Sequence, residues 1–139
     1  MDEHATLELR RARRAPRLAR TFAADILESW GIRAEDVEAL QLAVSELVTN
    51  AVLHAPESLT ITLDLYMTDG AVHVMVSDQS PRRPEVRRHS APWSAERGRG
   101  VELVDALADN WGTDPYPHGG KTVWCELRAE PRHDPRIGR

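Results

Sequence analysis

The chain holds a single cysteine, Cys125, among its 139 residues. One cysteine excludes a disulfide within the chain and a zinc site built from several cysteines, and its apolar surroundings predict a core position. Aromatic residues make up only 5% of the sequence. No apolar run approaches the roughly 20 residues that a membrane-spanning helix needs, and the N-terminus has no signal-peptide core. We therefore expect a cytoplasmic protein that does not enter a membrane.

Lysine is almost absent, since only one of the 18 Lys and Arg residues is a lysine, Lys121. Six arginines form a basic cluster near the N-terminus: Arg10, Arg11, Arg13, Arg14, Arg17 and Arg20. Such a cluster can bind nucleic acid, but the formal net charge of −4 and the absence of interleaved aromatic residues argue against it. We expect a solvated helix face without direct nucleic-acid contact, or a surface that meets an acidic protein.

The clearest helical pattern runs from Asp36 to Ala55. Its apolar residues fall in one stripe at helical spacing: Val37, Leu40, Val44, Leu47, Val48, Ala51 and Ala55. This stripe predicts a helix packed on a core. The arc that carries Glu38, Gln41, Ser45 and Thr49 is polar, and we expect it to be the solvated face.

One flank of the same helix carries Glu46, Asn50 and His54 at i, i+4 and i+8. The small residues Ala39 and Ala43 lie on this flank and leave space beside it. The pattern slightly favours the wall of a ligand pocket. The alternative is a polar seam whose hydrogen bonds are satisfied inside the fold.

The remaining patterns alternate between strands and helices. We predict a strand at Ala5–Arg10, a helix from Pro16 to Gly31, strands at Leu59–Tyr66 and Ala71–Ser77, a loop at Gln79–Arg97, a helix from Gly98 to Ala108, an extended piece at Asn110–Thr113, a turn at Pro115–Gly120 and a strand at Lys121–Leu127. This order predicts an α+β two-layer sandwich, with the helices on one face of a mostly antiparallel, mixed sheet. We expect a single domain over residues 1–130 and a polar, frayed tail over 131–139.

Several polar residues fit the parts of a nucleotide site. Gly98-Arg99-Gly100 before a helix offers main-chain N–H groups to phosphates, although the same sequence suits an ordinary turn. Asp78 at a strand end can accept a hydrogen bond from an amino group of a base, or serve as a turn residue. Asn50 is an oxygen ligand suited to Mg²⁺, and Glu46 is placed to act as a general base.

Four stretches together resemble the ATP-binding motifs of the GHKL superfamily: 46–55 (Glu-Leu-Val-Thr-Asn-Ala-Val-Leu-His-Ala), 76–78 (Val-Ser-Asp), 98–104 (Gly-Arg-Gly-Val-Glu-Leu-Val) and 119–124 (Gly-Gly-Lys-Thr-Val-Trp). Within it the sequence most resembles anti-sigma-factor serine kinases of the RsbW type, over roughly Arg14 to Arg128. The resemblance implies a Bergerat-type fold with ATP between the helices and a flexible lid at Gln79–Arg97.

The resemblance also implies a role for each matching residue. Asn50 corresponds to the Mg²⁺ ligand, Glu46 to the catalytic carboxylate and Asp78 to the acceptor of the adenine amino group. The remaining nucleotide-binding positions are Gly98, Arg99, Gly100 and Val101 at the phosphate loop, Ala51 and His54 near the phosphates or the pocket wall, and Thr122 in the network beside adenine. Arg99 either helps the γ-phosphate or is a solvated loop residue.

Proteins of the RsbW type bind a sigma factor and phosphorylate a serine on an anti-anti-sigma protein of the STAS fold, and they commonly dimerise. The resemblance therefore implies an ATP- and Mg²⁺-dependent serine/threonine protein kinase that regulates transcription, with a homodimer as a further expectation. The family often has glycines after the adenine-binding aspartate, whereas Gln79 and Ser80 follow Asp78 here. The alternative is a non-catalytic protein-binding module of the same fold that regulates a partner with or without bound ATP. We expect Lys121 to be an exposed strand-end residue, or to reach a phosphate or a partner.

Overall fold

A computed structural model describes residues 3–81, 104–116 and 119–129. The elements are β1 (Glu3–Arg10), α1 (Ala15–Ser29), α2 (Ala34–His54), β2 (Thr60–Thr68), β3 (Ala71–Asp78), β4 (Asn110–Tyr116) and β5 (Gly120–Arg128). Each confirms a predicted element, although β4 continues three residues beyond the expected end at Thr113. The expected lid falls mostly outside the described residues, as do the tail and the beginning of the expected third helix. Val104–Leu107 are helical.

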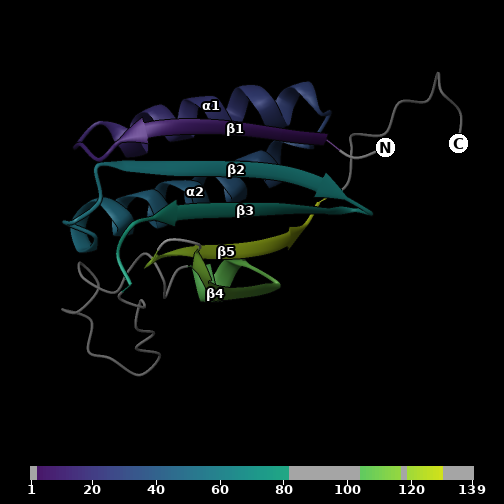
Figure 1. Cartoon of the computed structure of the whole chain (residues 1–139). Helices are drawn as coiled ribbons and strands as arrows, with labels where there is room; N and C mark the ends of the chain where they lie inside the picture. The colour runs from purple at the N-terminus through teal and green to yellow at the C-terminus, as the bar shows by residue number, and fades with distance from the viewer. Residues whose placement is uncertain (1–2, 82–103, 117–118, 130–139) are drawn as a thin grey trace, which may run out of the picture.

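The five strands form one sheet in the order β1-β2-β3-β5-β4, and every neighbouring pair is antiparallel. Both long helices lie on one face of this sheet (Figure 1). The predicted α+β two-layer sandwich is therefore confirmed, but the described sheet is purely antiparallel rather than mixed. The last strand, β5, lies between β3 and β4 instead of at an edge.

The core lies between the helices and the sheet. Every residue of the predicted apolar stripe of α2 is buried, as the periodicity requires. On α1 the buried line consists of Ala15, Ala19, Ala23 and Leu27. Because three of these four side chains are methyl groups, α1 can approach its neighbours closely. The larger Phe22, by contrast, packs at the margin of the core.

The polar arc of α2 packs against α1, so the predicted solvated face is wrong for two of its residues. Ser45 is buried, and its Oγ accepts a hydrogen bond from Arg20 Nη1 at 3.0 Å. Gln41 Nε2 donates to the main-chain oxygen of Arg20 at 3.1 Å. Arg20 on α1 supplies the partners that make burial of these polar groups acceptable.

Arg11, another member of the N-terminal basic cluster, also acts within the fold. Its Nε donates to the Ser58 carbonyl at 3.0 Å and its Nη1 to the Val52 carbonyl at 2.9 Å. These bonds join the end of β1 to the last turn of α2 and the connection to β2. The basic cluster is therefore not a uniformly solvated face.

Replacement of Arg11 by methionine is expected to lower the free energy of unfolding by about 2 kcal/mol, because hydrogen bonds from a charged group contribute roughly 1.5–3 kcal/mol each and this side chain is only partly buried. The measurement is urea denaturation followed by circular dichroism. Arg13→Met, at an exposed position two residues away, is the matched control and should stay within about 0.5 kcal/mol of wild type. Equal midpoints for the two variants would contradict the structural role of Arg11.

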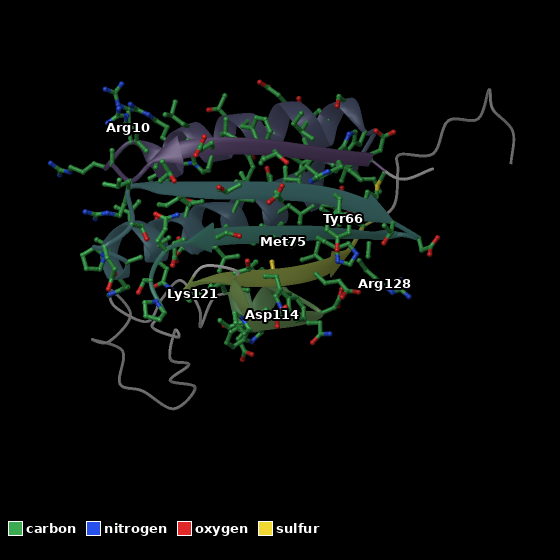
Figure 2. All side chains as sticks on the ribbon, in the orientation of Figure 1. Arg10, Tyr66, Met75, Asp114, Lys121 and Arg128 are labelled. Carbon is green, nitrogen blue, oxygen red and sulfur yellow. The ribbon has the colours of Figure 1, made fainter. Side chains whose placement is uncertain are left out.

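The sheet face opposite the helices is lined mainly by polar side chains, with a few large ones among them. Tyr66 and Met75 lie on it (Figure 2), and Tyr66 stacks on His73 with ring centroids 4.5 Å apart. Trp124 covers Gly112 of β4, where an added Cβ would lie 2.7 Å from the indole ring. No helix in the described ranges is long and apolar enough to cross a bilayer.

Two single-residue expectations have opposite outcomes. Leu59 is the first residue of the predicted strand Leu59–Tyr66, but it precedes β2 and is 83% exposed. Cys125 is buried in the core, as predicted, and burial raises the pKa of its thiol to about 12. A thiol with so high a pKa carries almost no thiolate near neutral pH, so Cys125 is not a nucleophile in the folded protein.

Candidate functional site

The end of β3, the beginning of β5 and the C-terminal end of α2 lie at the same end of the molecule (Figure 1). The register pairs Asp78 of β3 with Lys121 of β5. Two hydrogen bonds tie the connection after α2 to the segment after β3: Gln79 N donates to Ser58 Oγ at 2.8 Å, and Leu59 N donates to Gln79 Oε1 at 3.0 Å. The fold therefore brings the flank of α2 and the end of β3 to one region.

Among the predicted site residues that the structure describes, Asp78 is the most deeply buried, with 1% of its surface exposed. Its place in the alternation puts its side chain on the same side of β3 as Val74 and Val76, toward the helices. Oδ1 accepts a hydrogen bond from Ser80 N at 2.8 Å. Lys121 Nζ lies 3.0 Å from both carboxylate oxygens.

Lys121 is therefore not the exposed strand-end residue that we expected. Only 7% of its surface is exposed, and its ammonium group forms a buried ion pair with Asp78. The antiparallel register is the cause, because it sets the two side chains directly opposite each other on the inward face.

The polar flank of α2 becomes more exposed toward its C-terminal end. Glu46 and Asn50 are half-buried, whereas His54 is exposed. Ala51 is 6% exposed and belongs to the core. Partial exposure of Glu46 and Asn50 fits side chains at the wall of a site better than a sealed polar seam.

The structure does not bring Thr122 to the carboxylate of Asp78. Because Thr122 follows Lys121 in an extended strand, its side chain lies on the opposite face of the sheet. There the hydroxyl groups of Thr122 and Ser77 are hydrogen-bonded at 2.8 Å. The assignment of Thr122 to the network beside adenine stays a prediction. The phosphate-loop positions 98–101 lie outside the described residues.

A hollow of about 250 Å³ opens beside Lys121. Its wall is made of Pro81, Thr113, Asp114, Pro115, Gly119, Gly120 and Lys121. Gly120 lets the two main chains approach closely there, since a Cβ at this position would overlap the main-chain oxygen of Asp78. The ion pair thus lies between the close approach of β3 and β5 at Gly120 and the open hollow.

The described residues offer oxygen ligands rather than a preformed metal cluster. No three His, Cys, Asp or Glu side chains in the described ranges gather as metal ligands. Asn50 provides one amide oxygen, a hard ligand of the kind that Mg²⁺ takes when substrate phosphates fill other positions. The ligand types thus fit the predicted sharing of Mg²⁺ between one protein side chain and phosphates.

Sequence reasoning missed the partners of Asp78, namely Lys121 and Ser80. A signal was available for Lys121, because it shares the alternation of Val123 and Cys125, both of which are buried. Extending that pattern by one step would have placed the lysine on the inward face. The hydrogen bond from Ser80 depends on the path of the chain after β3, for which the sequence offers no periodic signal.

The fold is that of the GHKL ATPases and kinases, and the chain belongs to the histidine kinase-like ATPase domain family, which matches residues 9–126. Membership in this family implies ATP binding. The serine-protein kinase RsbW of Listeria innocua is 29% identical over 123 residues, which cover 79% of this chain and 78% of that protein. The sensor protein IrlS of Burkholderia pseudomallei is 29% identical over 105 residues.

The likeness extends to a solved structure, that of the RsbU and RsbW domains of a Mycobacterium tuberculosis protein. It superposes with a TM-score of 0.67 at 22% identity and covers 94% of this chain but 34% of that one. This likeness shows the fold. The matched part of IrlS is likewise only 22% of that sensor protein, so both proteins contain much that has no counterpart here.

Proposed function

We propose that this protein is an ATP-dependent anti-sigma factor that binds a sigma factor and phosphorylates a serine on a STAS-type anti-anti-sigma protein. The observation that carries the proposal is the placement of Asp78 at the end of β3, on the helix side of the sheet, at the same end of the molecule as the C-terminal end of α2, the helix that carries Glu46 and Asn50. The matches to RsbW proteins support the choice of partners.

Each residue has a role in this proposal. Asp78 accepts a hydrogen bond from the amino group of adenine, and the amide oxygen of Asn50 binds Mg²⁺. Glu46 takes the proton from the serine hydroxyl of the protein substrate as general base. ATP supplies the phosphoryl group. The supporting nucleotide contacts come from Ala51, His54, Gly98, Arg99, Gly100, Val101 and Thr122.

One observation favours a second candidate, a non-catalytic module that regulates a partner by contact alone. The carboxylate of Asp78 already has partners within the chain, since it contacts both Lys121 and Ser80. Gln79 is also engaged in hydrogen bonds with the connection after α2. A carboxylate used only to hold strands together would need no nucleotide.

Calorimetric titration with ATP and Mg²⁺ distinguishes the two candidates. We expect wild type to bind and Asp78→Asn to bind roughly ten- to a hundredfold more weakly, since a hydrogen bond to a charged acceptor contributes about 1.5–3 kcal/mol. Asparagine keeps the shape of the side chain and an acceptor for Ser80 N. Alanine would instead leave Lys121 buried beside a cavity.

Asp69→Asn is the matched control for charge, because Asp69 is exposed in the turn between β2 and β3 and its φ of 43° suits asparagine. This control should bind ATP as wild type does. If wild type shows no binding at millimolar ATP, the wild-type protein does not take the nucleotide, and the non-catalytic module acting without bound ATP is the better account.

A further inference from the structure

The buried ion pair between Lys121 and Asp78 is the contact in this chain that the family assignment leaves unexplained. Lys121 Nζ lies 3.0 Å from each carboxylate oxygen and 3.4 Å from the main-chain oxygen of Ser80. Both side chains are more than nine-tenths buried. Lys121 is also the only lysine in the sequence.

The ammonium group occupies the acceptors that a nucleobase would use. A carboxylate offers about four lone-pair sites on its two oxygens. Lys121 takes one on each oxygen, and Ser80 N takes a second on Oδ1. One site on Oδ2 remains, so an incoming amino group has to share Oδ2 with the ammonium or displace it from an oxygen of Asp78.

We propose that Lys121 competes with the base of the nucleotide for Asp78 and thereby sets the affinity of the site for ATP. This inference rests on the proposed ATP site. Lys121 also forms part of the wall of the hollow beside β4 and β5, and in this proposal the displaced ammonium moves into that hollow. ATP binding then exchanges a contact in which both the ammonium and the carboxylate are charged for a hydrogen bond from the uncharged amino group of the base to the same carboxylate.

Removing the charge of Lys121 should change the affinity for ATP in opposite directions, depending on whether the lysine competes with the base or binds phosphates directly. If the lysine competes with the base, loss of the ammonium frees an acceptor and strengthens ATP binding. If the lysine attracts phosphates, its loss weakens binding of every polyphosphate. The sign of the change in affinity therefore decides between the two roles.

The experiment compares wild type, Lys121→Met and Lys121→Arg by calorimetry with two Mg²⁺-loaded ligands, ATP and inorganic tripolyphosphate. Methionine keeps a long unbranched side chain without a donor, and arginine keeps the cation. We expect Lys121→Met to bind ATP roughly tenfold more tightly than wild type. Lys121→Arg should remain close to wild type, and the affinity for tripolyphosphate should be the same in all three proteins.

Because Lys121→Met leaves a buried carboxylate without its cation, its folded state is checked by circular dichroism and urea denaturation beside the double variant Asp78→Asn/Lys121→Met. The double variant should recover part of the stability that the single variant loses, which confirms the ion pair in solution. If the double variant loses as much free energy of unfolding as the two single variants together, Asp78 and Lys121 are not paired in solution.

If folded Lys121→Met binds ATP with unchanged or lower affinity, Lys121 does not compete with the base. The proposed ATP site then still stands, because wild type binds ATP. If Lys121→Met binds ATP and tripolyphosphate more weakly than wild type to the same degree, Lys121 binds phosphates instead. If neither wild type nor Lys121→Met binds ATP, the proposed function and this inference both fail. Binding by Lys121→Met alone would support the competition in its strongest form.

Discussion

Glu46→Gln is expected to lower phosphate transfer from ATP to a STAS-domain substrate by about 10²–10⁴-fold, the usual contribution of a positioned general base. Glutamine has nearly the same shape as glutamate but does not accept the proton of the serine hydroxyl. Glu46 is half-buried on α2, one turn before Asn50, so the substitution leaves the stripe that packs on the sheet untouched. ATP affinity should stay within about twofold of wild type, since in the proposed mechanism Glu46 does not hold the nucleotide.

Transfer of labelled phosphate from ATP measures this effect, with a STAS-domain protein that the wild type phosphorylates as substrate. Glu38→Gln is the matched control, because Glu38 is an exposed glutamate on the same helix. It should transfer phosphate at the wild-type rate. If Glu46→Gln and wild type behave alike in transfer and in ATP binding, Glu46 has no catalytic role and the kinase assignment fails.

Gly120→Ala is expected to lower the free energy of unfolding by about 3 kcal/mol, at the upper end of the range for overpacked sites. A Cβ at Gly120 would overlap the main-chain oxygen of Asp78, and it would also lie 3.0 Å from the Cα of Gln79. These are main-chain atoms, so no side-chain rotation can relieve the contact. The strand junction has to shift, and nucleotide affinity should fall with stability.

The neighbouring glycine provides a sharp control for this prediction. Gly119 has a φ of 98°, and nothing lies within 4 Å of a Cβ placed there. Gly119→Ala therefore introduces backbone strain without a clash, and we expect a loss of only about 1–2 kcal/mol. Urea denaturation measures both variants. A smaller loss for Gly120→Ala than for Gly119→Ala would show that the close approach of β3 and β5 is not rigid.

Periodicity was enough to predict the elements and much of the core. The stripe of α2 repeats over five turns, and strands β2 and β3 alternate around a two-residue turn, so local sequence determines which face is buried. The same reasoning placed Asp78 on the inward face of β3. It also placed Glu46 and Asn50 on one flank of α2, because a helix has a fixed angle per residue.

The errors at Gln41, Ser45 and Lys121 have one physical origin, which is contact between elements far apart in the sequence. Gln41 and Ser45 look like solvated residues until Arg20 on another helix donates and accepts hydrogen bonds beside them. Lys121 looks like an exposed residue until the register sets it opposite Asp78. Neither register nor helix packing has a signature within a single segment, so these contacts require the tertiary structure.

The position of β5 inside the sheet has a consequence for synthesis on the ribosome. Helices α1 and α2 and strands β1 to β3 are made first, and they leave the edge of β3 without its partner until residues 120–128 emerge. An unpaired edge of this kind invites pairing with other chains. The side chains of Asp78 and Lys121 are 43 positions apart, so their ion pair forms only after nearly the whole described chain has been translated. Nascent chains stalled before Gly120 should therefore depend on chaperones and lack the ion pair between Asp78 and Lys121.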